Sequence, residues 1–317
     1  MKETTDLTRL TNHRQRILRS AFGGSLEENA PLARFTAARV GGPGDAVITA
    51  KSVDHLAEVA SKLWELEFPF IVLGGGSNVL VSDKGIREVV ILNRAKEIKI
   101  EAESHSVWAG SGASFGQMAR RVSLKGFGGL EWAVGIPGSV GGAVYGNAGA
   151  HGGDVAGNLR VAEILHRYEG RKQWSVGQMD YTYRSSILKR DSLEGVILSA
   201  RFGFTESTVY AARKLTDHFA STRKKTQPPG ASMGSIFKNP PGDYAGRLIE
   251  LTGLKGTRIG GAEISPVHAN FFICDAGSKA SDIYALIRLV QKKVVEKFGV
   301  KLALEIELIG EWEPDEN

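Results

Sequence analysis

The sequence has 317 residues, which predicts about two domains, and its 42% hydrophobic and 24% charged residues exclude a disordered chain. The net charge of +5 comes from 40 basic and 35 acidic residues and is too small an excess to indicate nucleic-acid binding by itself. The single cysteine, Cys274, excludes a disulfide framework and a cysteine-rich metal site.

Residues 1–30 are predicted to form an N-terminal extension that contains a solvated basic helix with Arg14, Arg16 and Arg19. Met1 to Ser20 is polar and basic, and it lacks the apolar run of roughly 7–15 residues that a secretory signal requires. No stretch of the chain approaches the ~18 consecutive apolar residues of a membrane span. We therefore expect a cytoplasmic protein.

A helix and two strands are predicted next, in a βαβ-like arrangement. Ser52 is expected to cap a helix whose apolar residues recur at helical spacing over residues 56–64. The short apolar run 70–73 predicts a buried strand, and residues 89–92 predict a second strand. Between the two strands lies Gly74-Gly75-Gly76-Ser77-Asn78, where small residues allow backbone N–H groups to converge on an anion such as phosphate. A tight glycine turn without a ligand is the alternative interpretation.

Glycine is unusually frequent in the middle of the chain, beyond a helix that Ser114 is expected to cap. Eight glycines fall among the nineteen residues from 135 to 153, where the overall content of 39 in 317 would give about two. Glycines without a period inside a globular chain are typical of backbone that approaches a ligand closely. The segment 135–150 is also nearly uncharged, as a large flat or phosphorylated cofactor would favour. An elaborate loop that binds nothing is the alternative.

Regular elements are also predicted in the second half of the chain. Strands are expected over residues 161–168 and 195–204. A helix is expected from about residue 207 to residue 225, where it stops because residues that precede proline leave the helical region.

The C-terminal part shows the clearest periodicity. Ser281 is expected to cap a helix that ends at Gly299. The following residues alternate, with Leu302, Leu304, Ile306 and Leu308 on one face and mainly charged residues on the other, which predicts a strand with one buried face.

Several polar residues outside the glycine segments are candidates for catalysis, although each also has an ordinary structural explanation. Arg184 lies near tyrosines, where an arginine usually forms a surface ion pair. Ser235 stands between a glycine and apolar residues, where serine is usually structural, and Glu305 lies on the polar face of the last strand. His151 and His268 have no partner at metal-ligand spacing, so both are interpreted as structural and no metal site is expected.

A series of short motifs runs through the chain in a recognisable order. The motifs are Arg39-Val40-Gly41-Gly42-Pro43, Leu73-Gly74-Gly75-Gly76-Ser77-Asn78, Gly135-Ile136-Pro137-Gly138-Ser139-Val140-Gly141-Gly142, Tyr183-Arg184-Ser185-Ser186, Thr226-Gln227-Pro228, Gly234-Ser235-Ile236-Phe237-Lys238-Asn239-Pro240, His268-Ala269-Asn270-Phe271 and Glu305-Ile306-Glu307-Leu308-Ile309-Gly310. Together they resemble the UDP-N-acetylenolpyruvoylglucosamine reductase (MurB) family of peptidoglycan synthesis. The resemblance covers roughly residues 31–312.

The resemblance implies an α+β fold. An FAD-binding domain of the vanillyl-alcohol-oxidase (PCMH) type, with two α/β subdomains, would occupy residues 31–205, and a smaller α+β substrate-binding domain would occupy residues 206–317 and supply the catalytic strand. The implied cofactors are noncovalent FAD and NADPH, the latter as hydride donor. The residues that the resemblance assigns to FAD are Arg39, Gly74, Gly75, Gly76, Ser77, Asn78, Pro137, Gly138, Ser139, Gly141, Gly142, Asn147, Gly149, Ala150 and Arg223.

The implied reaction reduces the enolpyruvyl ether of UDP-N-acetylenolpyruvoylglucosamine to UDP-N-acetylmuramate. Arg184 matches the family arginine that stabilises the enolate-like charge formed on hydride addition. Glu305 matches the glutamate that assists, and it would need a raised pKa to act as a protonated donor. Ser235 matches the serine that delivers a proton to the other alkene carbon.

Two features depart from the family pattern. Family members often carry arginine where this chain has Glu307, and the short spacing between Arg184 and Ser235 leaves no room for a tyrosine-bearing loop, as in the type II form. Substrate contacts are therefore assigned to Tyr183, Lys238 and Asn239. Residues two apart in a strand face the same side, so Glu305 and Glu307 are expected to border one site, where like charges would raise one pKa. The alternative is that Glu307 points to solvent at the end of the strand.

Two alternative functions have less support in the sequence. Another flavoprotein of the same fold, such as a small-alcohol oxidase, is disfavoured by the combination of Arg184, Ser235 and Glu305. A nucleic-acid-binding protein is suggested by the pI of 9.2, but the basic residues are spread along the chain without a recognisable motif. The expected partner is a UDP-sugar substrate, with no nucleic acid, no membrane insertion and a monomeric state.

Overall fold

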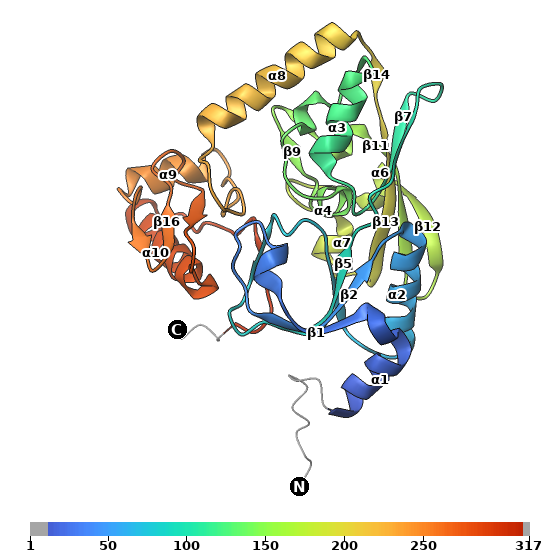
Figure 1. Cartoon of the computed structure of the whole chain (residues 1–317). Helices are drawn as coiled ribbons and strands as arrows, with labels where there is room; N and C mark the ends of the chain where they lie inside the picture. The colour runs from blue at the N-terminus through green and yellow to red at the C-terminus, as the bar shows by residue number, and fades with distance from the viewer. Residues whose placement is uncertain (1–11, 313–317) are drawn as a thin grey trace.

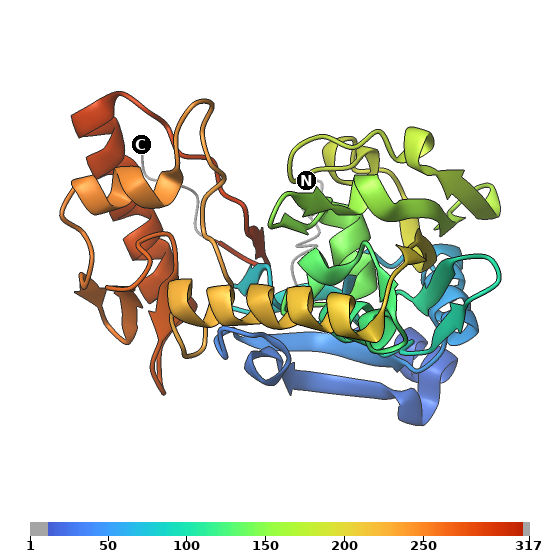
Figure 2. The same cartoon turned by 90° about the horizontal axis from the view of Figure 1, so that it is seen from above.

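The computed structural model describes residues 12–312 of the chain. They form two neighbouring lobes that each contain a sheet, a first lobe of residues 12–93 and a second lobe of residues 94–206 (Figure 1). Helix α8, Val209–Thr226, then runs across to a smaller third lobe of residues 227–306, and Figure 2 shows this helix from above. Helices and sheets share each lobe, which confirms the α+β class.

The first lobe contains a four-stranded sheet of order β1-β2-β5-β3, in which β2, β5 and β3 are parallel. Helix α2 covers it with the predicted apolar face, and the Ser52 hydroxyl caps this helix by accepting from the His55 N–H at 3.1 Å. The predicted βαβ unit is thereby confirmed. The elements are α1 Asn12–Phe22, the 3₁₀ helix η1 Gly23–Ser25, β1 Leu26–Pro31, η2 Leu32–Phe35, β2 Pro43–Ala50, α2 Val53–Glu65, β3 Phe70–Leu73, β4 Val79–Val81 and β5 Ile86–Asn93.

The N-terminal residues belong to the first lobe more closely than predicted. A basic helix forms, but its Leu18 is fully buried in the core beneath α2. Strand β1 pairs with β2 along its whole length, because the intervening residues double the chain back against the sheet edge. Within the described residues, the extension predicted for residues 1–30 is therefore part of the first lobe, since α1 packs on it through Leu18 and β1 forms an edge strand of its sheet. Residues 1–11 lie outside the described residues.

The second lobe is built on an antiparallel sheet of order β12-β11-β13-β7-β6. Helix α3, capped by Ser114 as predicted, packs its aromatic residue Phe115 against Phe202 of β13, with ring centroids 5.6 Å apart. The elements are β6 Ile98–Glu101, β7 Ser106–Gly110, α3 Phe115–Leu124, β8 Phe127–Gly128, η3 Glu131–Ala133, α4 Val140–Gly146, β9 Gly149–Ala150, β10 Gly153–Asp154, α5 Val155–Asn158, β11 Leu159–His166, β12 Gly170–Ser175, α6 Val176–Met179, α7 Ile187–Arg190, β13 Gly195–Gly203 and β14 Thr205–Glu206.

The third lobe packs α10 against a small sheet of order β15-β16-β17. Val40 and Leu80 of the first lobe are buried in the same core, so the two lobes share an apolar contact. The elements are α9 Ala245–Leu251, β15 Arg258–Ile259, β16 Ala262–Ile264, β17 Phe272–Cys274 and α10 Ala280–Phe298. The last strand of the chain, β18 Glu307–Ile309, pairs with β4 of the first lobe.

The start of α10 differs from the prediction, while its end at Gly299 is confirmed. Ser281 lies inside the helix, and the cap position is Lys279. The first free N–H groups are instead satisfied by Asp83 of the first lobe, whose carboxylate accepts from Ala280 at 2.8 Å and from Ser281 at 2.9 Å. A carboxylate at this helix end is favoured by the helix dipole. Asp83 therefore ties the third lobe to the first.

The last segment is a bent connection rather than the continuous strand predicted for residues 302–308. Leu302 and Ile306 are buried as the alternation predicts. However, the Lys238 N–H donates to Ala303 and the Glu305 N–H donates to Ile236, and the chain bends at residues 305–306 before β18 pairs in parallel with β4. The first half of the segment therefore forms its backbone hydrogen bonds with the third lobe, and the second half forms them with the first lobe. As a result, it crosses from the third lobe back to the first.

Candidate active site

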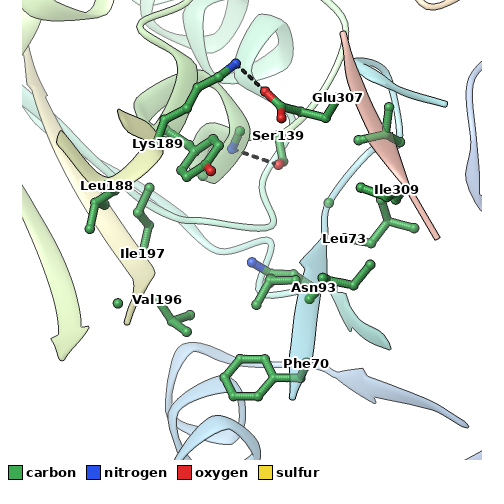
Figure 3. Close-up of a pocket in the computed structure, with 18 of the residues that line it drawn as sticks. Phe70, Leu73, Asn93, Ser139, Leu188, Lys189, Val196, Ile197, Glu307 and Ile309 are labelled. Atoms are coloured by element: carbon green, nitrogen blue, oxygen red, sulfur yellow. Dashed lines mark hydrogen bonds and ion pairs between the residues drawn. The ribbon is translucent and has the colours of Figure 1, made fainter. Parts of the chain in front are cut away.

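An interlobe cavity of about 790 Å³ lies between the first and second lobes. Figure 3 shows Phe70 and Val196 at one end of it and Lys189 and Glu307 at the other. Strand β3 forms part of the wall, so its residue Val72 is 38% exposed where a fully buried strand was predicted. The cavity runs along β3 from Phe70 to its carboxyl end, where the turn 74–78 follows, and ligands of α/β folds bind at the carboxyl ends of parallel strands.

Two glycine segments meet at this cavity. A Cβ added to Gly75 would lie 3.0 Å from the Cα of Gly138, and one added to Gly141 would lie 3.0 Å from the Cβ of Ser111. Gly75 therefore allows the turn 74–78 to pack on the segment 137–142, and Gly141 allows that segment to pack on the residues around Ser111. The packing of one loop on another explains part of the glycine content without any ligand.

The backbone of the turn 74–78 also offers an anion cradle. Within residues 12–312, the N–H groups of Gly75, Gly76 and Ser77 donate to no protein acceptor. The turn lines the cavity together with Ser139, Gly141 and Gly142, so these donors lie beside open space. Converging backbone N–H groups with no protein partner are suited to phosphate oxygens. A diphosphate-containing cofactor such as FAD fits this cradle and the elongated cavity beside it.

Arg94 lies directly behind the cradle and was missed by the sequence analysis. It follows β5 and donates from Nη1 to the carbonyl of Gly74 at 2.8 Å. No carboxylate in the described part of the chain pairs with it, and burial lowers the pKa of its guanidinium. An uncompensated cation at this position adds positive potential to the cradle. The only signal in the sequence was an arginine at the end of an apolar strand.

Arg184 is held in a strained turn at the edge of the second lobe. Its φ of +57° lies in the left-handed region that bulky residues rarely adopt. Its Nε donates to Glu305 Oε1 at 2.9 Å and its Nη2 donates to the carbonyl of Gly149 at 2.9 Å. The guanidinium therefore bridges the second lobe and the bent C-terminal segment. Backbone strain of this kind clusters at functional sites.

Glu305 is the partner of Arg184, and its side chain is 18% exposed. Burial raises the pKa of Glu305, while the charges of Arg184, Lys189 and Lys238 act in the opposite direction. The pKa of Glu305 is thus raised, as the sequence analysis required. Burial is the main cause of the shift, in agreement with the partly desolvated site that a neutral glutamic acid requires, and the additional repulsion expected from Glu307 is not among the causes.

Ser235 lies next to the segment that binds Glu305. The carbonyl of its neighbour Ile236 accepts from the Glu305 N–H at 2.8 Å, and Ser235 itself bridges to Phe271 through the backbone. The side chain is half-buried, and its hydroxyl has no hydrogen-bond partner among residues 12–312. The fold thus brings Arg184, Ser235 and Glu305 together from three separate segments.

Glu307 lines the interlobe cavity and forms an ion pair with Lys189 of α7 (Figure 3). The sequence analysis left open whether it points to solvent, and it did not identify Lys189. Glu305 and Glu307 both bind cations of the second lobe, so they face the same neighbour despite the bend between them. Each glutamate is paired with its own cation.

The other residues assigned to FAD lie outside the wall of the interlobe cavity. Arg39 is exposed on a turn whose Ala37 N–H donates to Gly76, and Arg223 is half-buried beside Gly135 with no described partner for its guanidinium. Pro137 and Gly138 belong to the segment that packs on the turn 74–78, and Gly149 and Ala150 lie in β9 beside Arg184.

Asn147 has a structural position in the second lobe. It is buried, and its side chain donates to the carbonyl of Thr182 at 3.2 Å and accepts from the Ala156 N–H at 3.0 Å. These bonds occupy the amide and support the turn that carries Arg184. The Asn147 side chain thus has a supporting role here, and its assignment to FAD stays a prediction.

The three residues assigned to substrate differ in their surroundings. The exposed ring of Tyr183 lies 5.4 Å from the Arg184 guanidinium, and Lys238 carries a charge that acts on Glu305. Asn239 accepts from the Ala245 N–H at 3.1 Å, so its oxygen is used at the start of α9. Within residues 12–312 no cluster of histidine, cysteine or carboxylate side chains is suited to a metal, and no helix is long and apolar enough to cross a membrane.

Comparison with known proteins defines the class first. Residues 43–169 match the model of an FAD-binding domain, and these residues contain both glycine segments and the cradle. The lobes on either side of the interlobe cavity thus form a PCMH-type FAD-binding unit of an FAD-dependent oxidoreductase.

The particular family follows from the whole chain. Residues 225–309 match the C-terminal domain of UDP-N-acetylenolpyruvoylglucosamine reductase. The reductases of Chloroflexus aggregans and Bacillus subtilis are each 41% identical, over 90% of this chain and over 98% and 95% of theirs. The crystal structure of the Thermus caldophilus reductase (MurB) matches with a TM-score of 0.76 and 34% identity, over 88% of this chain and 97% of that one. The chain belongs to the UDP-N-acetylenolpyruvoylglucosamine reductase family.

Proposed function

We propose that this chain reduces UDP-N-acetylenolpyruvoylglucosamine to UDP-N-acetylmuramate in peptidoglycan synthesis, and that Arg184, Ser235 and Glu305 act on the substrate. The family relationship supports the reaction, with FAD as cofactor and NADPH as hydride donor. The observation that carries the residue assignment is the 2.9 Å pair of Arg184 and Glu305. It joins the second lobe to the C-terminal segment, beside Ser235.

The cofactor would be held by the cradle and by the cations around it. The N–H groups of residues 75–77 are available to its diphosphate, and Arg94 and Arg223 carry positive charges that no described carboxylate neutralises. When bound, FAD supplies the transfer of hydride from NADPH to the substrate. The chain itself binds this group without a covalent link and orients it between the lobes.

Replacement of Gly75 by valine is expected to give a protein that folds but carries little flavin. A valine at Gly75 would press against Gly138, 3.0 Å from the new Cβ, and would displace the turn 74–78 from the neighbouring segment. Purified Gly75→Val protein should carry well under half of the wild-type flavin per chain, measured by absorbance against protein concentration. Gly177→Val is the control, because its nearest contact would be an ordinary 3.9 Å. Full flavin content in Gly75→Val would contradict this assignment of the turn.

Replacing Arg94 by methionine is expected to weaken FAD binding. The change removes the bond to the Gly74 carbonyl and the positive charge behind the cradle. A hydrogen bond from a charged group is worth about 1.5–3 kcal/mol, which corresponds to roughly 10- to 100-fold in the dissociation constant of FAD. Titration of the apoprotein with FAD measures this constant. Arg94→Lys keeps the charge and should lose less, so an equal loss in both variants would show that the charge is unimportant.

The substrate chemistry assigned to this chain uses one cation, one carboxyl group and one hydroxyl group. Arg184 would stabilise the negative charge that develops next to the substrate carboxylate, from a position already fixed by Gly149. Glu305, whose pKa is raised by burial, would donate a proton or hydrogen bond to the same charge. The Ser235 hydroxyl, free of protein partners, would deliver a proton to the other alkene carbon. Lys238 and Tyr183 are the proposed substrate contacts.

We also infer that the enzyme is a cytoplasmic monomer, with an FAD-binding domain that ends near residue 205 and a substrate domain beyond it. Every residue assigned to the site comes from one chain, so no second copy is needed to complete it. Sedimentation of the purified protein tests the monomeric state.

The reaction itself is tested by separating its two halves without oxygen. NADPH alone should bleach the visible absorbance of the purified protein, and the enolpyruvyl substrate should then restore it with formation of UDP-N-acetylmuramate. Restoration by oxygen alone, together with bleaching by a simple alcohol, would favour an oxidase instead.

A further inference from the structure

Two ion pairs connect the same two segments, and the second of them lines the interlobe cavity. Arg184 binds Glu305, and five residues further along the second lobe Lys189 binds Glu307. The two members of the second pair differ in exposure: the Lys189 side chain is 16% exposed and the Glu307 side chain is 39% exposed. Lys189 is thus a largely buried cation with one carboxylate partner.

The second pair concerns Glu305 because Lys189 lies within electrostatic range of it. Three cations act on Glu305: Arg184 from the strained turn, Lys189 from α7 and Lys238 from the segment beside Ser235. All three favour the ionised carboxylate, whereas the role proposed above needs Glu305 to hold a proton. Glu307 is the negative charge in direct contact with one of these cations.

We propose that Glu307 is a positioning residue which neutralises Lys189 and so preserves the charge balance in which Glu305 keeps its proton. The inference rests on the role proposed for Glu305. A glutamate at position 307 is then explained by the lysine opposite it. An arginine at this position would lie beside Lys189 and place two cations together. Burial raises the pKa of Glu305, and the balance around Lys189 decides how much of this increase survives.

Two other groups, Tyr145 and Asn78, lie near the two ion pairs. Tyr145 faces Glu307 from α4, and burial together with the charge of Glu307 raises the pKa of its hydroxyl, so Tyr145 stays neutral. The side-chain amide of Asn78 donates to the backbone carbonyl of Glu305 at 3.1 Å, so it contacts the backbone of Glu305 and not its carboxylate. The titration of Glu305 therefore depends on Arg184, Lys189, Lys238 and Glu307.

Four variants of the holoenzyme separate charge balance from simple docking of the segments. Glu307→Gln frees Lys189 to act on Glu305 and should lower the pKa of Glu305 by about one unit, the lower limit for a nearby opposite charge. Lys189→Met should raise it by a similar amount. The double variant removes both charges and should return the pKa close to that of the wild type. Lys189→Arg keeps the charge and should change little.

The pKa is measured in two independent ways. Carbon-13 NMR of glutamate-labelled holoenzyme follows the carboxyl of Glu305 directly, with Glu305→Gln identifying its signal. The pH profile of the substrate half-reaction should shift in the same direction, because the protonated form is lost at a lower pH in Glu307→Gln. Reduction of FAD by NADPH should keep its pH profile in all the variants.

The outcomes distinguish this inference from the proposed function. Unshifted Glu305 titration in both single variants, or a double variant no closer to the wild type than they are, would show that the pair only docks the segments. A pH profile of the substrate half-reaction that is the same in Glu305→Gln and in the wild type would instead remove the catalytic role of Glu305. A shift in the two single variants that is reversed in the double variant supports the inference.

Discussion

Replacement of Ser235 by alanine is expected to slow the substrate half-reaction by about 10²–10⁴-fold, the usual contribution of a positioned acid. Reduction of FAD by NADPH should remain near the wild-type rate, because no proton is delivered to an alkene carbon in that half. The structural reason is the position of the hydroxyl, which lies beside the segment of Glu305 and has no protein partner among the described residues.

Anaerobic stopped-flow measurement of each half-reaction provides the test of Ser235. Ser232→Ala makes the same chemical change three residues earlier in the same segment, and both half-reactions should be unaffected by it. Equal slowing of the two halves in Ser235→Ala would remove the serine from the role of acid. It would point to a displaced segment instead.

Replacement of Arg184 by methionine is the second change with a large expected effect, a loss of roughly 10²–10³-fold in the substrate half-reaction. The variant loses the group that stabilises developing charge, and it leaves Glu305 buried without its closest cation. The pKa of Glu305 should rise further, because the largest opposing charge has been removed. Arg184→Lys retains a charge but not the fork that reaches Glu305 and Gly149 together, so its activity should be intermediate.

Arg190→Met is the matched control for Arg184. Arg190 lies in the same part of the second lobe, where it pairs with Asp180 and donates to the Thr182 hydroxyl at 3.3 Å, and among the described residues it has no contact with Glu305. This variant should keep both half-reactions. A comparable loss in Arg190→Met would indicate that the segment had been disturbed as a whole, and an unchanged Arg184→Met enzyme would contradict the role of Arg184.

Local signals predicted most of the regular elements. The caps at Ser52 and Ser114 and the strand 70–73 form as expected, because a side chain within three residues or a short apolar run is sufficient to favour each one. The start of α10 was misplaced, since the carboxylate that caps it belongs to Asp83, 197 residues before Ala280. A serine at the right distance was a plausible but unused local cap.

The roles of Arg94, Lys189 and Asn147 could not be predicted from the sequence. Each depends on which backbone group or charge a side chain meets across a lobe boundary or a turn, and no spacing along the chain reports that contact. Asn147 stands in a glycine-rich motif and yet supports a turn. Lys189 is an ordinary helix residue until the C-terminal segment places Glu307 against it.

The family, the class of fold and the candidates Arg184, Ser235 and Glu305 were predictable from the sequence, because their motifs are local and keep their order. How these residues meet depends on the folding of distant segments. The bend at residues 305–306 arises since one half of the last segment bonds to the third lobe and the other half pairs with β4. That division of backbone hydrogen bonds between two lobes brings Glu305 to Arg184, and no pattern of apolar and polar residues encodes it.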